Sequence, residues 1–343
     1  MSKVTDTSAR KSNHLRINLE EDVQSGLTTG LERISFSHSA LPELDLQQID
    51  LSTFFLEKRL HYPIMISSMT GGSKSATDIN IALAEAAQEI GVAMGLGSQR
   101  AAIEDPSLEV SFQVRRFAPD ILLFANLGAV QLNYGYGIDE CRRAVGMIEG
   151  DALILHLNPL QEALQPEGDV DFSDLLRKIE GVCTQLEVPV VAKEVGWGIS
   201  PRIAKQLVNA GVAVIDVAGA GGTSWSQVEM HRAQDQKQAR MAAQFINWGI
   251  PTADALAGVR EALPDIPLIG SGGLRNGLDI AKCIALGADI CALAGPFLKA
   301  AVESSDKVRE ILQQLGEEIR ICMFATGSGS ISSLRQAKLL RRP

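Results

Sequence analysis

Four of the seven residues from His156 to Glu162 have side chains that can bind a ligand. His156 and Asn158 share one face of an extended segment, because side chains alternate along a strand, and Gln161 and Glu162 follow on the next turn. An imidazole suits a phosphate oxygen, an amide orients a substrate without adding charge, and a carboxylate binds a hard cation. One carboxylate cannot enclose a metal, so we expect any ion here to be Mg²⁺ bridged to substrate phosphates.

Two further polar residues interrupt apolar runs. Asn126 lies in FANLG and Lys193 in VVAKEVG, so both side chains need partners inside the fold. A buried lysine near N1 of a flavin would stabilise the anionic reduced ring. The alternative role is structural, as a salt bridge from Lys193 to Glu194 or Asp216.

Hydroxyl groups and glycines follow the first two apolar runs. Ser67 to Gly72 read SSMTGG and could hold the carbonyls and ring nitrogens of a flat heterocycle, although a plain turn and helix cap has the same sequence. Gly97 to Arg100 read GSQR, which places a hydroxyl and a guanidinium two residues apart and suits an anion. An arginine after a strand is otherwise a solvated charge, but Gly95 and Gly97 leave room for a ligand.

Eight short apolar runs must position these residues. They read PIMISSMTGG, GVAMGLGSQR, LLFANLG, ALILHLNPLQE, PVVAKEVGWG, VAVIDVAGAGGTSW, PLIGSGG and ICALAGP. Helical patterns separate them, including 78–90 and 200–209, and this alternation predicts a parallel sheet covered on its outside. We therefore predict an α/β fold, a TIM (β/α)8 barrel. A Rossmann sheet is disfavoured because no glycine cluster completes G-x-G-x-x-G.

Three glycine-rich segments follow the late strands of this barrel: Gly219–Thr223, Gly270–Arg275 and Ala294–Gly295. Barrels commonly bind phosphate on the loops after strands seven and eight, where backbone N–H groups face the ligand at helix starts. We expect a cofactor phosphate there, with tight turns as the alternative.

The chain reads as one barrel with additions. We expect an N-terminal arm and lead-in over 1–60, the barrel over 61–330 and a C-terminal tail over 331–343. Weak strand signals occur at 33–36. Residues from about 223 to 250 are too long and polar for a plain connection, so we expect an insertion or lid after strand six.

Composition excludes several classes of protein. The net charge of −9 and an aromatic content of 5% argue against nucleic acid as a partner, so any anionic substrate must meet a local basic cluster. No run approaches the roughly 18 apolar residues of a membrane span, and no signal peptide is apparent. The five scattered cysteines form no C-x-x-C pair, which indicates reduced thiols and a cytoplasmic protein.

Seven motifs in order carry a family resemblance. They are S-M-T-G-G, G-L-G-S-Q-R, A-N-L-G, H-x-N-x-x-Q-E, K-E-V-G, D-V-A-G-A-G-G-T-S-W and G-S-G-G-L-R, and Arg10-Lys11-x-x-His14-Leu15 precedes them. With these motifs the chain resembles the type 2, FMN-dependent isopentenyl-diphosphate isomerases, from about Arg10 to Gly329. No motif position departs from the pattern.

The resemblance implies a role for each matching residue. Those implied to bind FMN are Ser68, Met69, Thr70, Ser98, Asn126, Lys193, Thr223, Gly272, Gly273, Leu274, Arg275, Ala294 and Gly295. Those implied to bind substrate are Arg10, Lys11, Ser98, Gln99, Arg100, His156, Asn158 and Gln161. Gln161 and His156 would act with reduced FMN in catalysis, and Glu162 would hold Mg²⁺.

The implied reaction interconverts isopentenyl and dimethylallyl diphosphate without net redox. Protonating an unactivated alkene needs an acid stronger than ordinary side chains, so reduced FMN is the plausible acid/base group, with NADPH as external reductant. The family also implies a homo-oligomer, a tetramer or octamer.

Two other functions remain open. An FMN-dependent 2-hydroxy acid oxidase shares the barrel but needs a histidine base after a late strand, and AGAGGTSW and PLIGSGGLR contain none. A non-catalytic barrel that binds a phosphate ligand is the other alternative.

Overall fold

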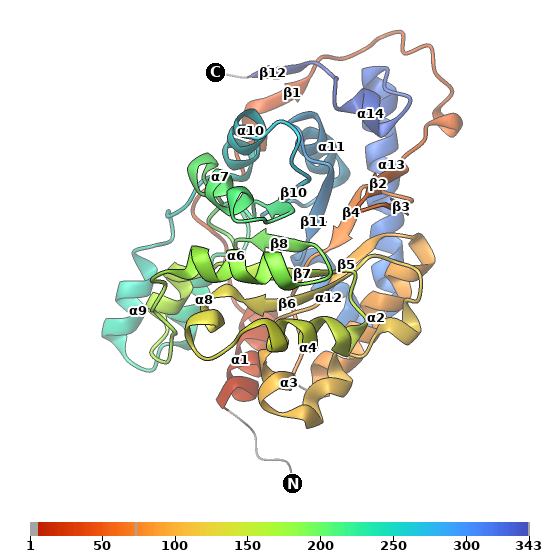
Figure 1. Ribbon diagram of the computed structural model, residues 1–343. Helices are drawn as coiled ribbons and strands as arrows, with labels where there is room; N and C mark the ends of the chain where they lie inside the picture. The colour runs from red at the N-terminus through yellow and green to blue at the C-terminus, as the bar shows by residue number, and fades with distance from the viewer. Residues whose placement is uncertain (1–5, 73, 342–343) are drawn as a thin grey trace.

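The chain forms a closed barrel of eight parallel strands in a computed structural model that describes residues 6–72 and 74–341 (Figure 1). The hydrogen-bonded order is β10–β11–β4–β5–β6–β7–β8–β9. The strands are β4 (Ile64–Ile66), β5 (Ala93–Gly95), β6 (Leu123–Gly128), β7 (Ala152–His156), β8 (Val190–Lys193), β9 (Val214–Asp216), β10 (Leu268–Ser271) and β11 (Ile290–Leu293). Each strand lies in one of the eight apolar runs, so the predicted barrel is confirmed.

Helices cover the outside of the barrel. They are α2 (Lys74–Ile90), α4 (Ile138–Ile148), α6 (Leu175–Gln185), α7 (Pro201–Asn209), α10 (Thr252–Ala262), α11 (Gly277–Ala285) and α13 (Ser305–Thr326). The two helices predicted over 78–90 and 200–209 are α2 and α7. Helix α7 begins after Ser200, whose Oγ accepts a hydrogen bond from the N–H of Ile203, as expected of a serine cap.

The inside of the barrel is filled by one apolar side chain or two from each strand. These buried residues are Met65, Ala93, Phe124, Ala152, Ile154, Val191, Val214, Ile269, Ile290 and Ala292. The hairpin of β2 (Thr53–Phe55) and β3 (Lys58–Leu60) packs Phe55 and Leu60 into the same cluster. The hairpin thus closes one end of the apolar core, and the opposite end of the barrel is left to receive a ligand.

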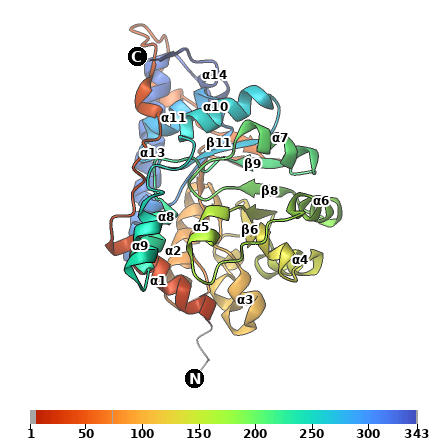
Figure 2. The ribbon, with the colours of Figure 1, turned by 90° about the vertical axis from the view of Figure 1, so that its left-hand side faces the viewer.

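The arm, the insertion and the tail all have regular structure. Helix α1 (Asp6–Glu20) lies beside α8 (Trp225–Arg232), and α9 (Gln236–Ala243) follows α8 in the predicted insertion (Figure 2). Strand β1 (Ile34–Phe36) pairs antiparallel with β12 (Leu339–Arg341), at the opposite end of the molecule from α1. Helix α14 (Ile331–Leu334) precedes β12. Residues 1–5 and 342–343 of the predicted arm and tail lie outside the described residues.

Short helices complete the open end of the barrel: α3 (Arg100–Glu104), α5 (Pro159–Leu164) and α12 (Gly295–Glu303). Among the described residues, no helix combines the length and apolar character needed to cross a membrane.

Candidate active site

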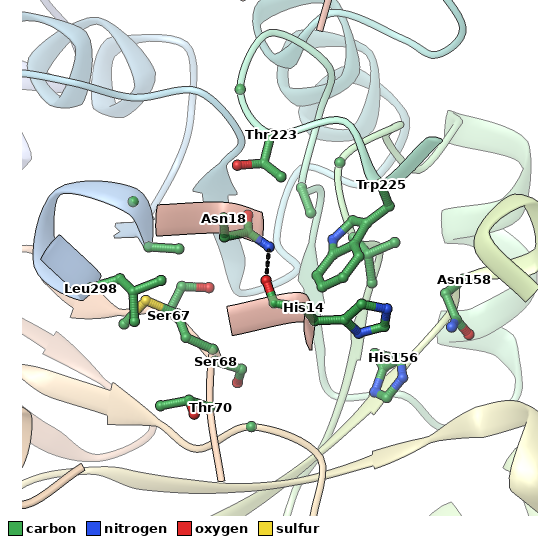
Figure 3. A pocket seen from close by; sticks show the side chains of 18 of the residues that line it. His14, Asn18, Ser67, Ser68, Thr70, His156, Asn158, Thr223, Trp225 and Leu298 are labelled. Atoms are coloured by element: carbon green, nitrogen blue, oxygen red, sulfur yellow. Dashed lines mark hydrogen bonds between the residues drawn. The ribbon is translucent and has the colours of Figure 1, made fainter. Parts of the chain in front are cut away.

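A pocket of about 730 Å³ opens at the carboxyl ends of the barrel strands (Figure 3). Every strand end contributes to its wall, and α1 and α8 lie over it. The predicted site residues that line it are Arg10, Lys11, Ser68, Met69, Thr70, Ser98, Arg100, Asn126, His156, Asn158, Gln161, Glu162, Lys193, Thr223, Gly272, Gly273, Leu274, Arg275, Ala294 and Gly295. The structure thus brings together residues spread over nearly 300 positions of sequence.

Gln99 is the exception, and its predicted contact with substrate is wrong. Its side chain is fully buried, donates from Nε2 to the backbone oxygen of Ala144 at 2.7 Å and accepts at Oε1 from the N–H of Asn126 at 2.9 Å. Gln99 therefore holds β6 in place from behind the pocket. The sequence GSQR places four residues at the mouth but does not determine which way each side chain turns.

A layer of polar side chains lies directly above the apolar core of the barrel. Each member stands two residues after a core residue of its strand, so both point inward. We call it the polar layer; its members are Ser67, Asn126, His156, Lys193, Asp216 and Ser271, and all but His156 are at least nine-tenths buried. The change from apolar to polar at this level forms the floor of the pocket.

His156 is uncharged in this layer. Its Nδ1 lies 2.8 Å from Oδ1 of Asn126, so the imidazole donates there and keeps a lone pair on Nε2. Burial, followed by the positive charges of Lys193, Lys11 and Arg10, lowers the pKa of His156 to about 3. His156 can therefore position a ligand at neutral pH but adds no positive charge of its own.

Lys193 is the buried cation of the layer. Its ammonium donates to the backbone oxygen of Glu194 at 2.6 Å. Within the described structure, neither Glu194 nor Asp216 approaches Nζ closely enough for an ion pair, so the structural alternative raised by the sequence does not hold in that form. The side chain lines the pocket and leaves its charge available to a ligand above it.

Glu162 lies in a cluster of oxygen donors on α5 and the loop after it. Its carboxylate accepts from Nδ2 of Asn158 at 2.8 Å, from Nε2 of Gln165 and from the N–H of Asp169 at 2.8 Å. Because a carboxylate can only accept, both amides turn their nitrogens toward it, and Oδ1 of Asn158 and Oε1 of Gln165 are left without hydrogen-bond partners. The charged oxygens of Glu162, with the free amide oxygens of Asn158 and Gln165 close by, are the kind of hard oxygen ligand that suits Mg²⁺.

Positive charge gathers at the mouth on α1. The ammonium of Lys11 donates to the backbone oxygen of Ser98 and lies 5.2 Å from the ring centroid of Phe112. Its burial and the neighbouring guanidinium of Arg10 lower the pKa of Lys11 to about 7. Arg100 is instead paired with Glu104 and Asp169, at 2.6 Å each. At neutral pH the amine of Lys11 is therefore only partly protonated, and a bound anion would favour its charged form.

The glycine-rich loops after β9 and β10 interlock. A Cβ at Gly272 would lie 2.1 Å from the backbone oxygen of Gly219, and one at Gly222 would lie 2.6 Å from the N–H nitrogen of Gly273. Gly272 and Gly273 also have positive φ angles of 107° and 74°. Neither loop can carry a side chain at these positions, so the backbones themselves form the wall of the pocket.

These loops fit the phosphate of a flavin nucleotide. Helix α12 begins at Gly295 with no side-chain cap at Ala294, so the first N–H groups of the helix face the pocket without a side-chain acceptor. A Cβ at Gly295 would meet no atom within 4 Å. On the neighbouring strand end, after β4, Oγ of Ser68 is buried and has no hydrogen-bond partner among the described residues. The pocket thus offers backbone N–H groups to a phosphate and a free hydroxyl to another part of the same ligand.

An ionic chain, which the sequence analysis missed, fastens α1 across the mouth. Nε2 of His14 lies 3.0 Å from Glu229 of α8, the other oxygen of Glu229 lies 2.7 Å from Nε of Arg232, and Arg232 continues to Glu167 at 2.6 Å. The ring of His14 also meets Trp225 edge-on at 5.1 Å, and Figure 3 shows both at the pocket. We call His14, Glu229, Arg232 and Glu167 the latch.

Only part of the latch has a signal in the sequence. Glu229 and Arg232 have the i, i+3 spacing of a helical ion pair, and Lys11 and His14 are likewise three residues apart. The contact between the two helices joins residues more than 200 positions apart, which no local pattern reveals. Gln165 had no signal of its own, because it lies beyond the H-x-N-x-x-Q-E motif.

Comparison with known proteins adds independent information. A protein-family model described as FMN-dependent dehydrogenase matches residues 20–111 and 162–341. The chain is 55% identical over 342 residues to an isopentenyl-diphosphate delta-isomerase of Nostoc sp. (strain PCC 7120), covering 99% of this chain and 98% of that protein. It is 54% identical to the protein of that name from Stutzerimonas stutzeri (strain A1501), covering 97% of both.

Solved structures resemble the chain in fold. A mandelate oxidase variant with a monooxide FMN adduct superposes with a TM-score of 0.69 at 20% identity, covering 95% of both chains. A lactate oxidase of Pediococcus acidilactici gives a TM-score of 0.66 at 18% identity, covering 96% of this chain and 87% of that one. At such low identity the likeness concerns the barrel alone.

The latch predicts the effect of one substitution. Glu229 is 1% exposed, and although burial opposes it, hydrogen bonds from His14 and Arg232 hold the pKa of Glu229 below its usual range. Glu229→Gln should therefore weaken the docking of α1 by about 2 kcal/mol, since it removes the buried carboxylate that His14 of α1 contacts. Limited trypsin digestion should cut faster at Arg16. Glu20→Gln, which removes an exposed ion pair of the same helix, is the control and should leave the cleavage rate unchanged.

Proposed function

Since the chain belongs to the FMN-dependent dehydrogenase family and, within it, to the isopentenyl-diphosphate delta-isomerases of type 2, we propose that its pocket holds reduced FMN on the polar layer and the substrate between the flavin and α1. The chain interconverts isopentenyl and dimethylallyl diphosphate. One observation carries the placement: four members of the polar layer (Ser67, Asn126, His156 and Lys193) and the interlocked glycine loops line one pocket of about 730 Å³. That volume suits a nucleotide together with a small diphosphate.

The flavin contacts follow from the wall of the pocket. In this proposal the ring and ribityl chain are held by Ser68, Met69, Thr70, Ser98, Asn126, Lys193 and Thr223. The phosphate is held by Gly272, Gly273, Leu274, Arg275, Ala294 and Gly295. Reduced FMN supplies, when bound, an acid/base group for adding a proton to one carbon and removing one from another. The buried, partnerless Oγ of Ser68 and the uncapped start of α12 support this orientation.

The substrate contacts come from the mouth. We place the diphosphate against Arg10, Lys11, Ser98, Arg100, His156 and Asn158. Gln161 faces the isoprenoid end, where its amide orients the alkene or carries a proton without adding charge. Glu162 holds Mg²⁺ against the diphosphate oxygens, and Asn158 and Gln165 orient its carboxylate.

Helix α1 has a second task in this arrangement. The double-bond shift passes through a state with carbocation character, which water would quench. With the latch closed, α1 lies over the pocket and brings Lys11 to the backbone of Ser98. The same helix therefore supplies positive charge for the diphosphate and excludes water from the carbon chain.

Three finer points complete the proposal. NADPH reduces the flavin from outside, consistent with the missing G-x-G-x-x-G fingerprint. The protein assembles as a homo-oligomer, a tetramer or octamer. It works in the cytoplasm, where thiols remain reduced; all five cysteines are free.

An oxidase of 2-hydroxy acids is the alternative that the fold likeness brings to mind. Such chemistry needs a histidine base close to the substrate after a late strand. The histidines that line the pocket are His14, from α1, and His156, from β7, whereas His231 contacts the backbone oxygen of Asp22 on the outside. This arrangement favours the isomerase.

A direct assay tests the function. Purified protein with FMN, Mg²⁺ and isopentenyl diphosphate should form dimethylallyl diphosphate only after the flavin is reduced, by NADPH or dithionite. Turnover without any flavin, or none with reduced FMN, would contradict the proposal. If the protein binds and releases isopentenyl diphosphate without converting it, the chain would be a phosphate-binding barrel instead.

The role of Glu162 makes a second prediction. Glu162→Gln should raise the Mg²⁺ concentration for half-maximal activity by roughly tenfold or more while FMN stays bound, because the cation loses a charged oxygen ligand. Glu21→Gln, another carboxylate at the pocket, is the matched control and should not shift the Mg²⁺ curve. An unaltered curve for Glu162→Gln would assign the metal to substrate and water alone.

The lowered pKa of Lys11 makes a third prediction. Below about pH 7 the ammonium is already charged; above it, the free enzyme must take up a proton to meet the diphosphate. KM should therefore rise with pH above 7, by up to about tenfold per unit. In Lys11→Arg the charge persists, so the rise should flatten. Equal slopes of KM against pH from 7 to 9 in both proteins would remove Lys11 from the diphosphate site.

A further inference from the structure

Asp216 is a fully buried carboxyl group of the polar layer that no step above uses. It is 0% exposed and ends β9, and the pocket lining does not include it. In the parallel ladder its Cα is the direct partner of Lys193, so the two side chains enter the barrel from adjacent strands at the same level. A buried carboxyl beside a buried ammonium requires an electrostatic account.

The hydrogen bonds of Asp216 are those of an ionised carboxylate. Oδ1 accepts from Oγ of Ser271 at 2.5 Å and from the N–H of Ala218 at 3.3 Å. Oδ2 has no hydrogen-bond partner among the described residues. A protonated carboxyl would bury an O–H with nothing to accept it, which costs about 1–3 kcal/mol. Burial raises the pKa of Asp216, while the charge of Lys193 and then the bond from Ser271 oppose that rise.

The other carboxylate near Lys193 is already occupied. Oε2 of Glu194 accepts the backbone N–H groups of Val195, Gly196, Trp197 and Gly198, at 2.5 to 3.1 Å. These four donors draw Glu194 into the loop after β8. Asp216, with one oxygen unpartnered, is thus the better counter-charge for the ammonium inside the barrel.

We propose that Asp216, held by Ser271, is a positioning residue that keeps Lys193 protonated beneath the flavin and so sets the electrostatic environment of the reduced ring. The inference rests on the proposed placement of FMN over Lys193. Without the carboxylate, a buried ammonium would lose its proton more readily, because burial disfavours the charged form. The flavin ring would then lose the positive charge of Lys193 beneath it as pH rises.

Asp216 also makes a structural contact, whose effect the experiment has to separate from the proposed role. Ala218, whose N–H it accepts, has a φ of 37°, so the carboxylate fixes a strained turn before the glycine-rich loop. Loss of that bond would loosen FMN at every pH alike. The test must therefore follow a property of the flavin as a function of pH.

Midpoint potentials of the FMN-loaded proteins, measured from pH 6 to pH 9, provide this test. Relative to wild type, Asp216→Asn should have a higher potential at pH 6, where Lys193 keeps its charge and one negative charge is gone. As pH rises, the potential of Asp216→Asn should fall more steeply than that of wild type, because Lys193 loses its proton. By pH 9 it should approach the potential of Lys193→Met. Ser271→Ala should be raised at pH 6 only, because it weakens Asp216 as an acid, and should rejoin wild type at pH 9.

Other titrating groups do not obscure this result. His156 and Glu194 lie near Lys193, and Lys11 lies above them on α1. Cys291 of β11 points out of the barrel toward Ile280 of α11, yet it still senses the charge of Asp216. His156 is neutral and Cys291 protonated throughout, because burial lowers the pKa of the imidazole to about 3 and raises that of the thiol well above its usual value. Glu194 and Lys11 have pKa values near 7, and the pKa of Glu194 depends on the charge of Lys193, so its own titration moves between the proteins. The potentials are therefore compared at pH 6 and pH 9, on either side of that titration.

Each outcome decides the inference. A profile of Asp216→Asn that overlays wild type, or runs parallel to it at every pH, would overturn it. Should Asp216→Asn not fold or not retain FMN, Ser271→Ala decides alone, and its coincidence with wild type would overturn the inference. Asp289→Asn, at the far end of β10, controls for general loosening of the barrel. If wild type binds no FMN, or Lys193→Met leaves the potential unchanged, the proposed placement fails instead.

Discussion

Polar side chains enclosed in a barrel have to find their partners without bulk water, and this constraint shapes the whole of the pocket. The apolar core fills the barrel to the level of residues such as Ile154 and Val191, and above it the next inward position is polar on six of the strands. Asn126 satisfies His156, and Ser271 satisfies Asp216. Groups outside these pairs, above all the ammonium of Lys193, keep their charge or hydrogen-bonding capacity for a ligand in the pocket.

The mouth of the pocket is subject to a different constraint, because a protein with a net charge of −9 has to bind a negatively charged diphosphate. Its barrel contributes little free positive charge: His156 is neutral and Arg100 is paired with Glu104 and Asp169. The charge comes instead from α1, a helix that precedes the barrel and is fastened by the latch. In the proposed site the cation for the diphosphate and the cover of the pocket belong to one helix, so the docking of α1 also brings in the charge of Lys11.

The sequence was sufficient to predict the repeating strands and helices of the barrel. It also predicted those site residues that stand in a short, continuous motif. Continuous apolar runs predicted all eight strands, and polar interruptions such as Asn126 and Lys193 marked the inward face. It was insufficient wherever a side chain chooses between two directions or meets a distant helix. The side chain of Gln99 turned away from the pocket because it bonds two backbone groups, the N–H of Asn126 in β6 and the oxygen of Ala144 in α4. The contact of His14 with Glu229 depends on how an insertion folds back, which periodicity does not encode.

The interlocked glycine loops constrain one another's sequence. A side chain added at Gly222 or Gly272 would collide with the backbone of the other loop, so neither loop can change without its neighbour. The family model matches both loops but not residues 112–161, the stretch that contains Asn126, His156 and Gln161. In the proposed site this rigid pair of loops holds the phosphate of the nucleotide, whereas β6 and β7, which belong to the unmatched stretch, carry residues that face the rest of the pocket.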